Sequence, residues 1–104
     1  MEISKKDWQL FRTRLPDWQE AYMDKLIKEY VSLLNTEKNA SEKFWELERL
    51  IEHDKHCPGV SVQLRKSDMI ANLINFINDR VICFEDLSDF SDEIKETVRF
   101  YLGK

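Results

Sequence analysis

A chain of 104 residues, 42% apolar and 35% charged, is long enough to bury one hydrophobic core and too apolar to be a disordered segment. Its formal net charge of −4 differs from the basic balance typical of nucleic-acid-binding domains. Two glycines and two prolines are too few for a chain of short strands and tight turns, so the composition favours long helices.

Charged residues interrupt every stretch that would be long enough to span a membrane, so we expect no transmembrane segment. The N-terminal sequence MEISKKDWQLF lacks the apolar core of a signal peptide. These two features predict a cytoplasmic protein. In that compartment Cys57 and Cys83 are expected to remain reduced thiols rather than a disulfide.

The first 40 residues predict two helices. Ser4 has the hydroxyl of a helix N-cap, and we expect a short helix that begins there and bends at Leu15 and Pro16. A long second helix then runs to about Asn35, with apolar residues recurring on one face. The polar stretch NTEKNA, residues 35–40, is expected to be a loop.

Three further helices are expected in the rest of the chain, and EDLSDF, residues 85–90, is expected to be a single turn or a short helix before the last of them. Ser41 is predicted to cap a third helix, which ends within HDKHCPG. A fourth helix is expected from about 61 to 78, and its wide apolar arc predicts the most buried, central position. Ser91 is predicted to cap the last helix. The expected buried faces are Phe44, Leu47, Leu50 and Ile51 in the third helix, and Ile94, Val98 and Tyr101 in the last.

The periodicity as a whole predicts an all-α protein, with residues 1–104 forming a single-domain bundle of five or six helices. The helix at about 61–78 is expected at the centre of this bundle.

The stretch IEHDKHCPGV, residues 51–60, contains both histidines of the chain and one of its cysteines. His53 and His56 lie three residues apart, and Cys57 is adjacent. A stable zinc site needs three or four ligands, usually in two separated pairs, and the second pair is missing. Catalytic Cys–His pairs are normally brought together from distant positions. We therefore interpret this stretch as the end of a helix and expect no metal there.

No motif for catalysis or for cofactor binding is present. A phosphate-binding loop needs several glycines close together, whereas Gly59 and Gly103 stand alone. Carboxylates are abundant, but acid–base catalysis requires them in a cleft with separated pKa values, and solvated helix faces are the simpler interpretation. The sequence therefore predicts no enzyme, no catalytic residue and no cofactor.

Nucleic-acid binding is the alternative function. The third helix, the Pro-Gly turn and the fourth helix resemble a helix-turn-helix in outline. In that arrangement Gln63, Arg65 and Lys66 would face a groove of the nucleic acid. The acidic balance of the chain argues against this alternative.

Two surface features point instead to a protein partner. Residues 67–104 carry four bases and eight acids, so an acidic patch could attract a basic partner. Apolar residues that lie off the predicted core stripes would form an exposed contact surface; Trp45 points about 150° from the centre of its stripe. The acidic patch comprises Glu85, Asp86, Asp89, Asp92, Glu93 and Glu96, and the candidate interface residues are Trp45, Leu10 and Phe100.

Five segments together resemble an uncharacterised family of small bacterial helical proteins: ISKKDWQLFR, LPDWQEAYMDKL, KFWELERLIEHDKHCPGV, RKSDMIANL and FEDLSDFSDEIKETV. The similarity covers nearly the whole chain, although Cys57 before Pro58 departs from the usual pattern of the family. Members often carry an automatic "multidrug transporter" label, which the missing membrane span contradicts. The resemblance implies a helical fold and no established activity, so it assigns no functional residue.

The sequence therefore predicts a small cytoplasmic protein-interaction or regulatory module without catalytic activity. Its expected partner is another protein or a second copy of the chain, and no membrane is involved. A helix-turn-helix-like nucleic-acid-binding regulator is the alternative.

Overall fold

The computed structural model describes residues 2–103, and within them it contains helices and no strand. The predicted all-α class is confirmed, but the described residues form four α-helices where five or six were expected. Two short 3-10 helices, η1 and η2, lie in the C-terminal half. The elements are α1 (Lys5–Leu34), α2 (Ala40–Asp54), η1 (Lys66–Asp68), α3 (Met69–Asn78), η2 (Phe84–Leu87) and α4 (Asp92–Tyr101).

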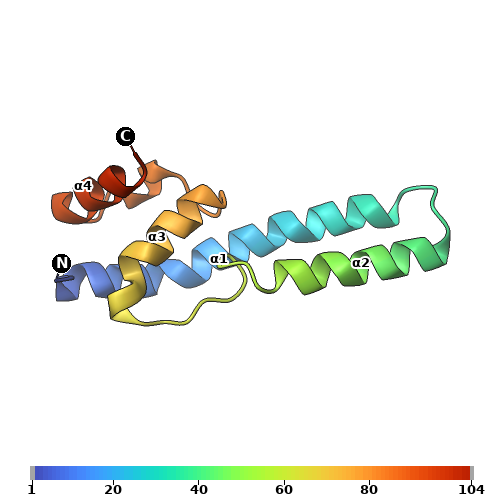
Figure 1. Ribbon diagram of the computed structural model, residues 1–104, viewed down its shortest axis with the longest axis horizontal. Helices are drawn as coiled ribbons and strands as arrows, with labels where there is room; N and C mark the ends of the chain where they lie inside the picture. The colour runs from blue at the N-terminus through green and yellow to red at the C-terminus, as the bar shows by residue number, and fades with distance from the viewer. Residues whose placement is uncertain (1, 104) are drawn as a thin grey trace.

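The molecule is elongated, with principal extents of 52 × 25 × 18 Å, and α1 runs along its length (Figure 1). We call residues 19–54 the hairpin: the C-terminal half of α1, a short loop and α2, which returns antiparallel beside α1. We call the remainder the head. In the head, α3 and α4 lie beside the N-terminal half of α1 (Figure 1).

Helix α1 begins where the sequence predicts but does not end at Pro16. The Ser4 hydroxyl accepts a hydrogen bond from the backbone N–H of Asp7 at 3.1 Å, which confirms the predicted N-cap. The predicted division into two helices at Leu15 and Pro16 is wrong, because one α-helix passes through this proline. Leu15 before the proline and Trp18 after it both pack on the head core. This burial offsets the roughly 3 kcal/mol that proline costs inside a helix.

Two other helix boundaries differ from the predictions. The N-cap of α2 is Asn39, so Ser41 lies inside the helix and the predicted cap is wrong. The predicted helix at 61–78 is shorter: α3 begins at Met69, and residues 61–65 have no helical structure. The alternating sequence VSVQL places most of its side chains in solvent, so no buried face stabilises a helix before η1.

The hydrophobic core lies in the head, and α3 supplies its centre, as predicted. Met69, Leu73 and Phe76 of α3 are fully buried, and Phe76 stacks on Phe11 of α1 with ring centroids 6.2 Å apart. The other buried core residues are Ile3, Leu15, Ile82, Leu87, Phe90, Ile94 and Val98.

Helix α4 covers α3 through a short apolar stripe. The Ser91 hydroxyl accepts a hydrogen bond from the Ile94 N–H at 3.3 Å, so the predicted cap is confirmed. Ile94 and Val98 are buried as predicted. Tyr101 was expected on the same buried face but is exposed, because Leu102 continues the i, i+4 stripe of Ile94 and Val98 and packs on the core instead.

The largest difference concerns α2. No residue of this 15-residue helix is buried, although its apolar stripe was predicted to be a buried face. Phe44 is 64% exposed and Ile51 is 44% exposed, and Leu50 is exposed too. The physical reason is that α1 covers only one side of α2, and no third helix within residues 2–103 covers the apolar side.

Candidate interaction surface

Polar contacts hold the base of the hairpin together. The Tyr30 hydroxyl donates a 2.6 Å hydrogen bond to Oδ2 of Asp54, which joins α1 to the last turn of α2. Burial, followed by this contact with Asp54, raises the pKa of Tyr30, so its hydroxyl stays protonated at neutral pH. Nearer the head, Gln19 donates to the carbonyl oxygen of Pro58 at 3.2 Å. The two helices are therefore held in a defined register.

Gly59 allows the chain to pass close to α1 shortly after the end of α2. Gly59 is buried against the ring of Tyr22, and a Cβ at this position would lie 2.4 Å from Cδ2 of that ring. Only a residue without a side chain fits this approach. Gly59 thus allows the segment that follows α2 to pack on α1.

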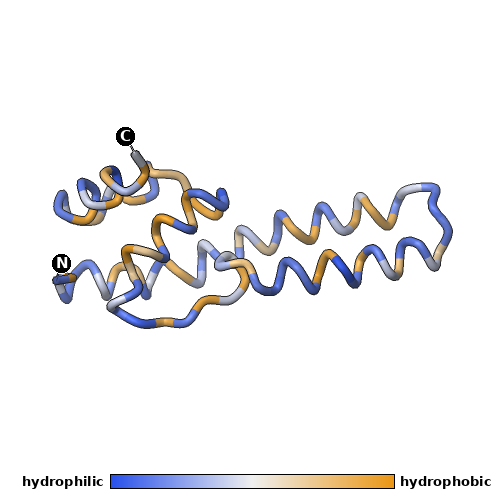
Figure 2. The backbone as a smooth tube through the Cα atoms, viewed as in Figure 1, coloured by the Kyte–Doolittle hydropathy of each residue, from blue (hydrophilic) through white to orange (hydrophobic). Residues whose placement is uncertain are grey.

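Apolar residues recur along each helix of the hairpin (Figure 2), and several of them are exposed. On α1, Ile27 is 55% exposed, and Val31 and Leu34 follow it at helical spacing and are also exposed. On α2, Phe44 and Ile51 lie seven residues apart and share one face. We define the hairpin face by the six residues Ile27, Val31, Leu34, Phe44, Leu47 and Ile51.

The two stripes form one continuous surface. A groove of about 250 Å³ between the helices is lined from both sides, by Ile27 of α1 and Ile51 of α2. A second depression along α2 is lined by Ile51 together with Phe44 and Leu47. Because Ile51 belongs to both, the groove between the helices continues along α2 as far as Phe44. The groove lining comprises Met23, Leu26, Ile27, Tyr30, Ile51, Asp54, Lys55 and Val60.

Charged side chains of both signs lie along the edges of the hairpin face. On α1, Lys28 pairs with Asp24 at 3.0 Å, and both side chains are well exposed. On α2, Lys55 pairs with Glu52 at 2.8 Å, and this contact lowers the pKa of Glu52. An apolar centre with a charged rim is the usual arrangement of a protein–protein interface.

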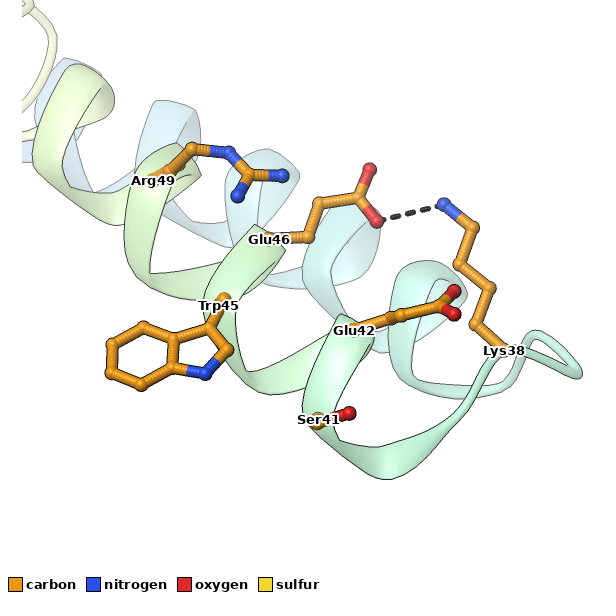
Figure 3. A pocket seen from close by; sticks show the side chains of 6 residues that line it. All are labelled: Lys38, Ser41, Glu42, Trp45, Glu46 and Arg49. Atoms are coloured by element: carbon orange, nitrogen blue, oxygen red, sulfur yellow. Dashed lines mark hydrogen bonds and ion pairs between the residues drawn. The ribbon is translucent and has the colours of Figure 1, made fainter.

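Trp45, a predicted interface residue, is exposed at the margin of the hairpin face. Its ring meets that of Phe44 edge to face, with centroids 5.0 Å apart. It also lines a shallow pocket on α2, where the indole points away from the ion pair that Lys38 forms with Glu46 at 2.7 Å (Figure 3). Trp45 lies about 100° around α2 from Phe44 and is therefore not part of the groove. Its role at an interface stays a prediction.

The other two predicted interface residues lie in the head, away from Trp45. Leu10 is half-buried and packs against the head core. Phe100 is 75% exposed and meets the ring of Tyr101 edge to face at 5.3 Å. The structure therefore does not bring the three residues into one surface.

The cluster of His53, Asp54 and Cys57 lies at the base of the hairpin, at the end of α2. Nδ1 of His53 lies 3.2 Å from Oδ1 of Asp54, and these two residues and Cys57 bring possible ligand atoms within 4.8 Å of one another. His56 points elsewhere, 3.6 Å from a Glu52 oxygen. Burial, and then the Asp54 charge, raise the pKa of the Cys57 thiol. A protonated thiol is a poor nucleophile, and three ligands are one fewer than a structural zinc site uses.

The predicted acidic patch is exposed around η2 and the start of α4, but several of its carboxylates have local partners. Asp86 accepts a hydrogen bond from the Cys83 backbone N–H at 2.8 Å, and Asp89 forms a 2.6 Å ion pair with Arg14 of α1. These carboxylates therefore contribute to structure in the head. A role in attracting a basic partner stays a prediction.

The candidate nucleic-acid contacts lie on the segment that joins α2 to α3. Gln63, Arg65 and Lys66 are exposed, and Arg65 donates a hydrogen bond to Gln63 at 2.5 Å. Residues 55–68 separate the two α-helices, whereas a helix-turn-helix has a turn of about three or four residues. The helix pair therefore lacks this motif's geometry, and any contact with nucleic acid stays a prediction.

Across residues 2–103, no helix has the length and apolar character needed to cross a lipid bilayer. Comparisons with protein-family models, with curated proteins and with solved structures give no match to the chain. The resemblance to a family of small bacterial helical proteins therefore stays a prediction, and the function has to be argued from the surface of the molecule.

Proposed function

We propose that this chain is a cytoplasmic, non-catalytic protein-interaction module, and that it binds its partner through the hairpin face. The observation that carries the proposal is α2, a 15-residue amphipathic helix without a single buried residue. A regulatory role would follow if binding is reversible.

The energetics of α2 support the proposal. Isolated helices of about 12–15 residues are marginal in water, and most helical stability in proteins comes from burying an apolar face. In the single chain α1 covers one side of α2 and leaves Phe44 and Ile51 in water. A protein that docks on the hairpin face would supply the missing burial.

The composition of the surface supports it as well. Scattered exposed apolar residues are common on any protein, but a contiguous apolar patch with a polar rim usually marks an interaction site. Phe44 is the largest exposed side chain of the hairpin face, and a well-packed aromatic residue often dominates binding energy.

The chemistry elsewhere favours binding over catalysis. The Cys57 thiol lies near His53, but its raised pKa disfavours the thiolate that nucleophilic catalysis needs. Asp54 is already engaged by the Tyr30 hydroxyl. These contacts stabilise the chain at the end of α2 and are structural rather than catalytic.

Photo-cross-linking in the native cell tests the proposal. A photoreactive phenylalanine analogue is placed at Phe44 or, as the matched control, at Phe100, an equally exposed aromatic on the head. We expect a cross-linked protein adduct from the first position and little or none from the second. Adducts from neither position, or from position 100 alone, would show that the hairpin face is not the docking surface.

A further inference from the structure

We propose that the partner on the hairpin face is a second copy of this chain, so that two hairpins pack face to face as a four-helix bundle with both tips pointing the same way. This inference rests on the proposed function and adds the identity of the partner. In this pairing a two-fold axis runs along the hairpins, and α1 of each copy lies against α2 of the other.

The hairpin has the shape of half a bundle. Four-helix bundles are built from antiparallel helix pairs that bury apolar residues at helical spacing between them. Ile27 and Ile51 line the same groove and therefore lie near one another along the hairpin. With about 1.5 Å of rise per residue, Leu34 and Phe44 share a second level seven residues nearer the tip. The pairing places Ile27 over the partner's Ile51.

The head leaves the hairpin face accessible to a second copy. At about 100° per residue, Phe11 and Trp18 lie about 160–180° around α1 from Ile27. Phe11 and Trp18 pack on the head core. The head therefore extends from the side of α1 opposite the hairpin face, and two heads at the same end of the bundle do not collide across the interface.

The buried area fits a stable dimer. Each exposed side chain of the hairpin face leaves about half of its surface, or about 90 Å², in solvent, so five of them present about 450 Å² per copy. Complete burial of these side chains in both copies would remove about 900 Å² of apolar surface from water. Homodimer interfaces are about 65% apolar, so the total is about 1,400 Å², within the roughly 1,200–2,000 Å² of specific complexes. The five residues are Ile27, Val31, Leu34, Phe44 and Ile51.

The rim charges select the orientation with both tips together. In this orientation Lys28 of α1 lies at the level of the partner's Glu48 and Glu52, and Asp24 lies near the partner's Lys55, so opposite charges meet at both edges. In the reversed orientation the centre of α2 would meet itself, and Glu48 would face the partner's Glu48. Like charges at that position disfavour the reversed pairing.

Sedimentation equilibrium over a range of concentrations tests the inference with the full chain. We expect a mass approaching twice the chain mass of 12.5 kDa. Ile51→Lys places a charge at the centre of the hairpin face and should raise the dimer dissociation constant by at least about 100-fold. Phe100→Lys, at an exposed apolar residue outside the face, should leave it unchanged. Val31→Lys serves as the second variant if Ile51→Lys fails to give a native circular dichroism spectrum.

Charge reversal tests the orientation. Lys28→Glu and Glu48→Lys should each weaken the dimer several-fold, because rim ion pairs contribute little each, and the two changes combined should restore it. Tighter association of Glu48→Lys alone would contradict the pairing with both tips together.

Several results would overturn the inference. A chain that stays monomeric at every concentration excludes the second copy, as does a dimer that Ile51→Lys leaves intact. If the monomeric chain still gives an adduct from position 44 with a protein of different mass, the proposed function stands and only the identity of the partner is wrong. If the adduct from position 44 is also missing, both the proposed function and the second copy as its partner are wrong.

Discussion

Asp7 is the buried carboxylate that ties the N-terminal end of α1 to α4, and Asp7→Asn should destabilise the head strongly. The side chain is only 4% exposed. Its Oδ1 accepts a 3.0 Å hydrogen bond from the Ser91 backbone N–H, and its Oδ2 accepts from the Ser91 hydroxyl at 2.7 Å and from the Ser4 hydroxyl at 3.0 Å. Ser4 and Ser91 are themselves the N-caps of α1 and α4. The negative charge of Asp7 therefore stabilises the N-termini of both α1 and α4.

The expected loss follows from these contacts. An asparagine keeps one accepting oxygen, but its amide nitrogen cannot accept from either hydroxyl, and the negative charge near two helix dipoles is lost. Hydrogen bonds to charged groups contribute about 1.5–3 kcal/mol each, and part of this returns when the hydroxyls rotate to other acceptors. We expect a net loss of about 2–3 kcal/mol in the free energy of unfolding. For a domain of this size the melting temperature should fall by about 10–20 °C.

The effect should depend on pH with a defined sign. Burial alone would raise the pKa of Asp7, but hydrogen bonds from Ser91 and Ser4 outweigh it, and the folded-state pKa lies below the ordinary value. A lowered folded pKa gives stabilisation that is fully present above about pH 4 and is lost as the pH falls through the folded pKa. The stabilities of the wild type and of Asp7→Asn should therefore converge in acid.

Urea unfolding followed by far-UV circular dichroism measures both effects. Asp17→Asn is the matched control, because this carboxylate is exposed on the same helix. It should change the unfolding free energy by less than about 0.5 kcal/mol. An Asp7→Asn variant as stable as this control at neutral pH would refute the assigned role, and so would a stability difference that persists unchanged in strong acid.

Three further substitutions test the hairpin and α1, each by the same urea titration. Gly59→Ala should destabilise by about 2–4 kcal/mol, because its Cβ would lie 2.4 Å from the Tyr22 ring; a stability equal to wild type would show that the ring moves freely. Tyr30→Phe removes the 2.6 Å hydrogen bond to Asp54 and should cost about 1–2 kcal/mol, and a neutral result would mean that water replaces the hydroxyl. Pro16→Ala should stabilise by about 1–3 kcal/mol, because α1 is continuous at this exposed position; destabilisation would indicate that the proline is preferred there.

Local signals in the sequence predicted helix starts well where a cap is made within one turn. Ser4 and Ser91 both cap helices, because the hydroxyl and the N–H that it accepts from lie three residues apart. Pro16 misled the prediction because its cost is offset by core contacts on both sides of it, which come from residues distant in the chain. No local pattern in the sequence indicates the role of Asp7, since its contact with Ser91 spans 84 residues.

The apolar stripe of α2 shows a feature that the sequence pattern alone does not predict. A 3.6-residue period identifies an amphipathic helix but does not say which chain covers its apolar side. Phe44 and Ile51 were therefore expected in the core of this chain and are exposed instead. The short polar loop before Ala40 was the sequence signal for this exposure. Such a loop joins antiparallel neighbouring helices, and a hairpin of two helices covers only one side of each helix.

Footprinting by hydroxyl radicals tests most directly whether another chain covers the hairpin face. Phe44 and Phe100 are both well exposed in the single chain, so each is the internal reference for the other. At a concentration where the protein is assembled, Phe44 should oxidise several-fold more slowly than Phe100, and Ile51→Lys should bring the two rates together. Equal oxidation of both side chains in the wild type at every concentration, and in extract of the native cell, would contradict the account.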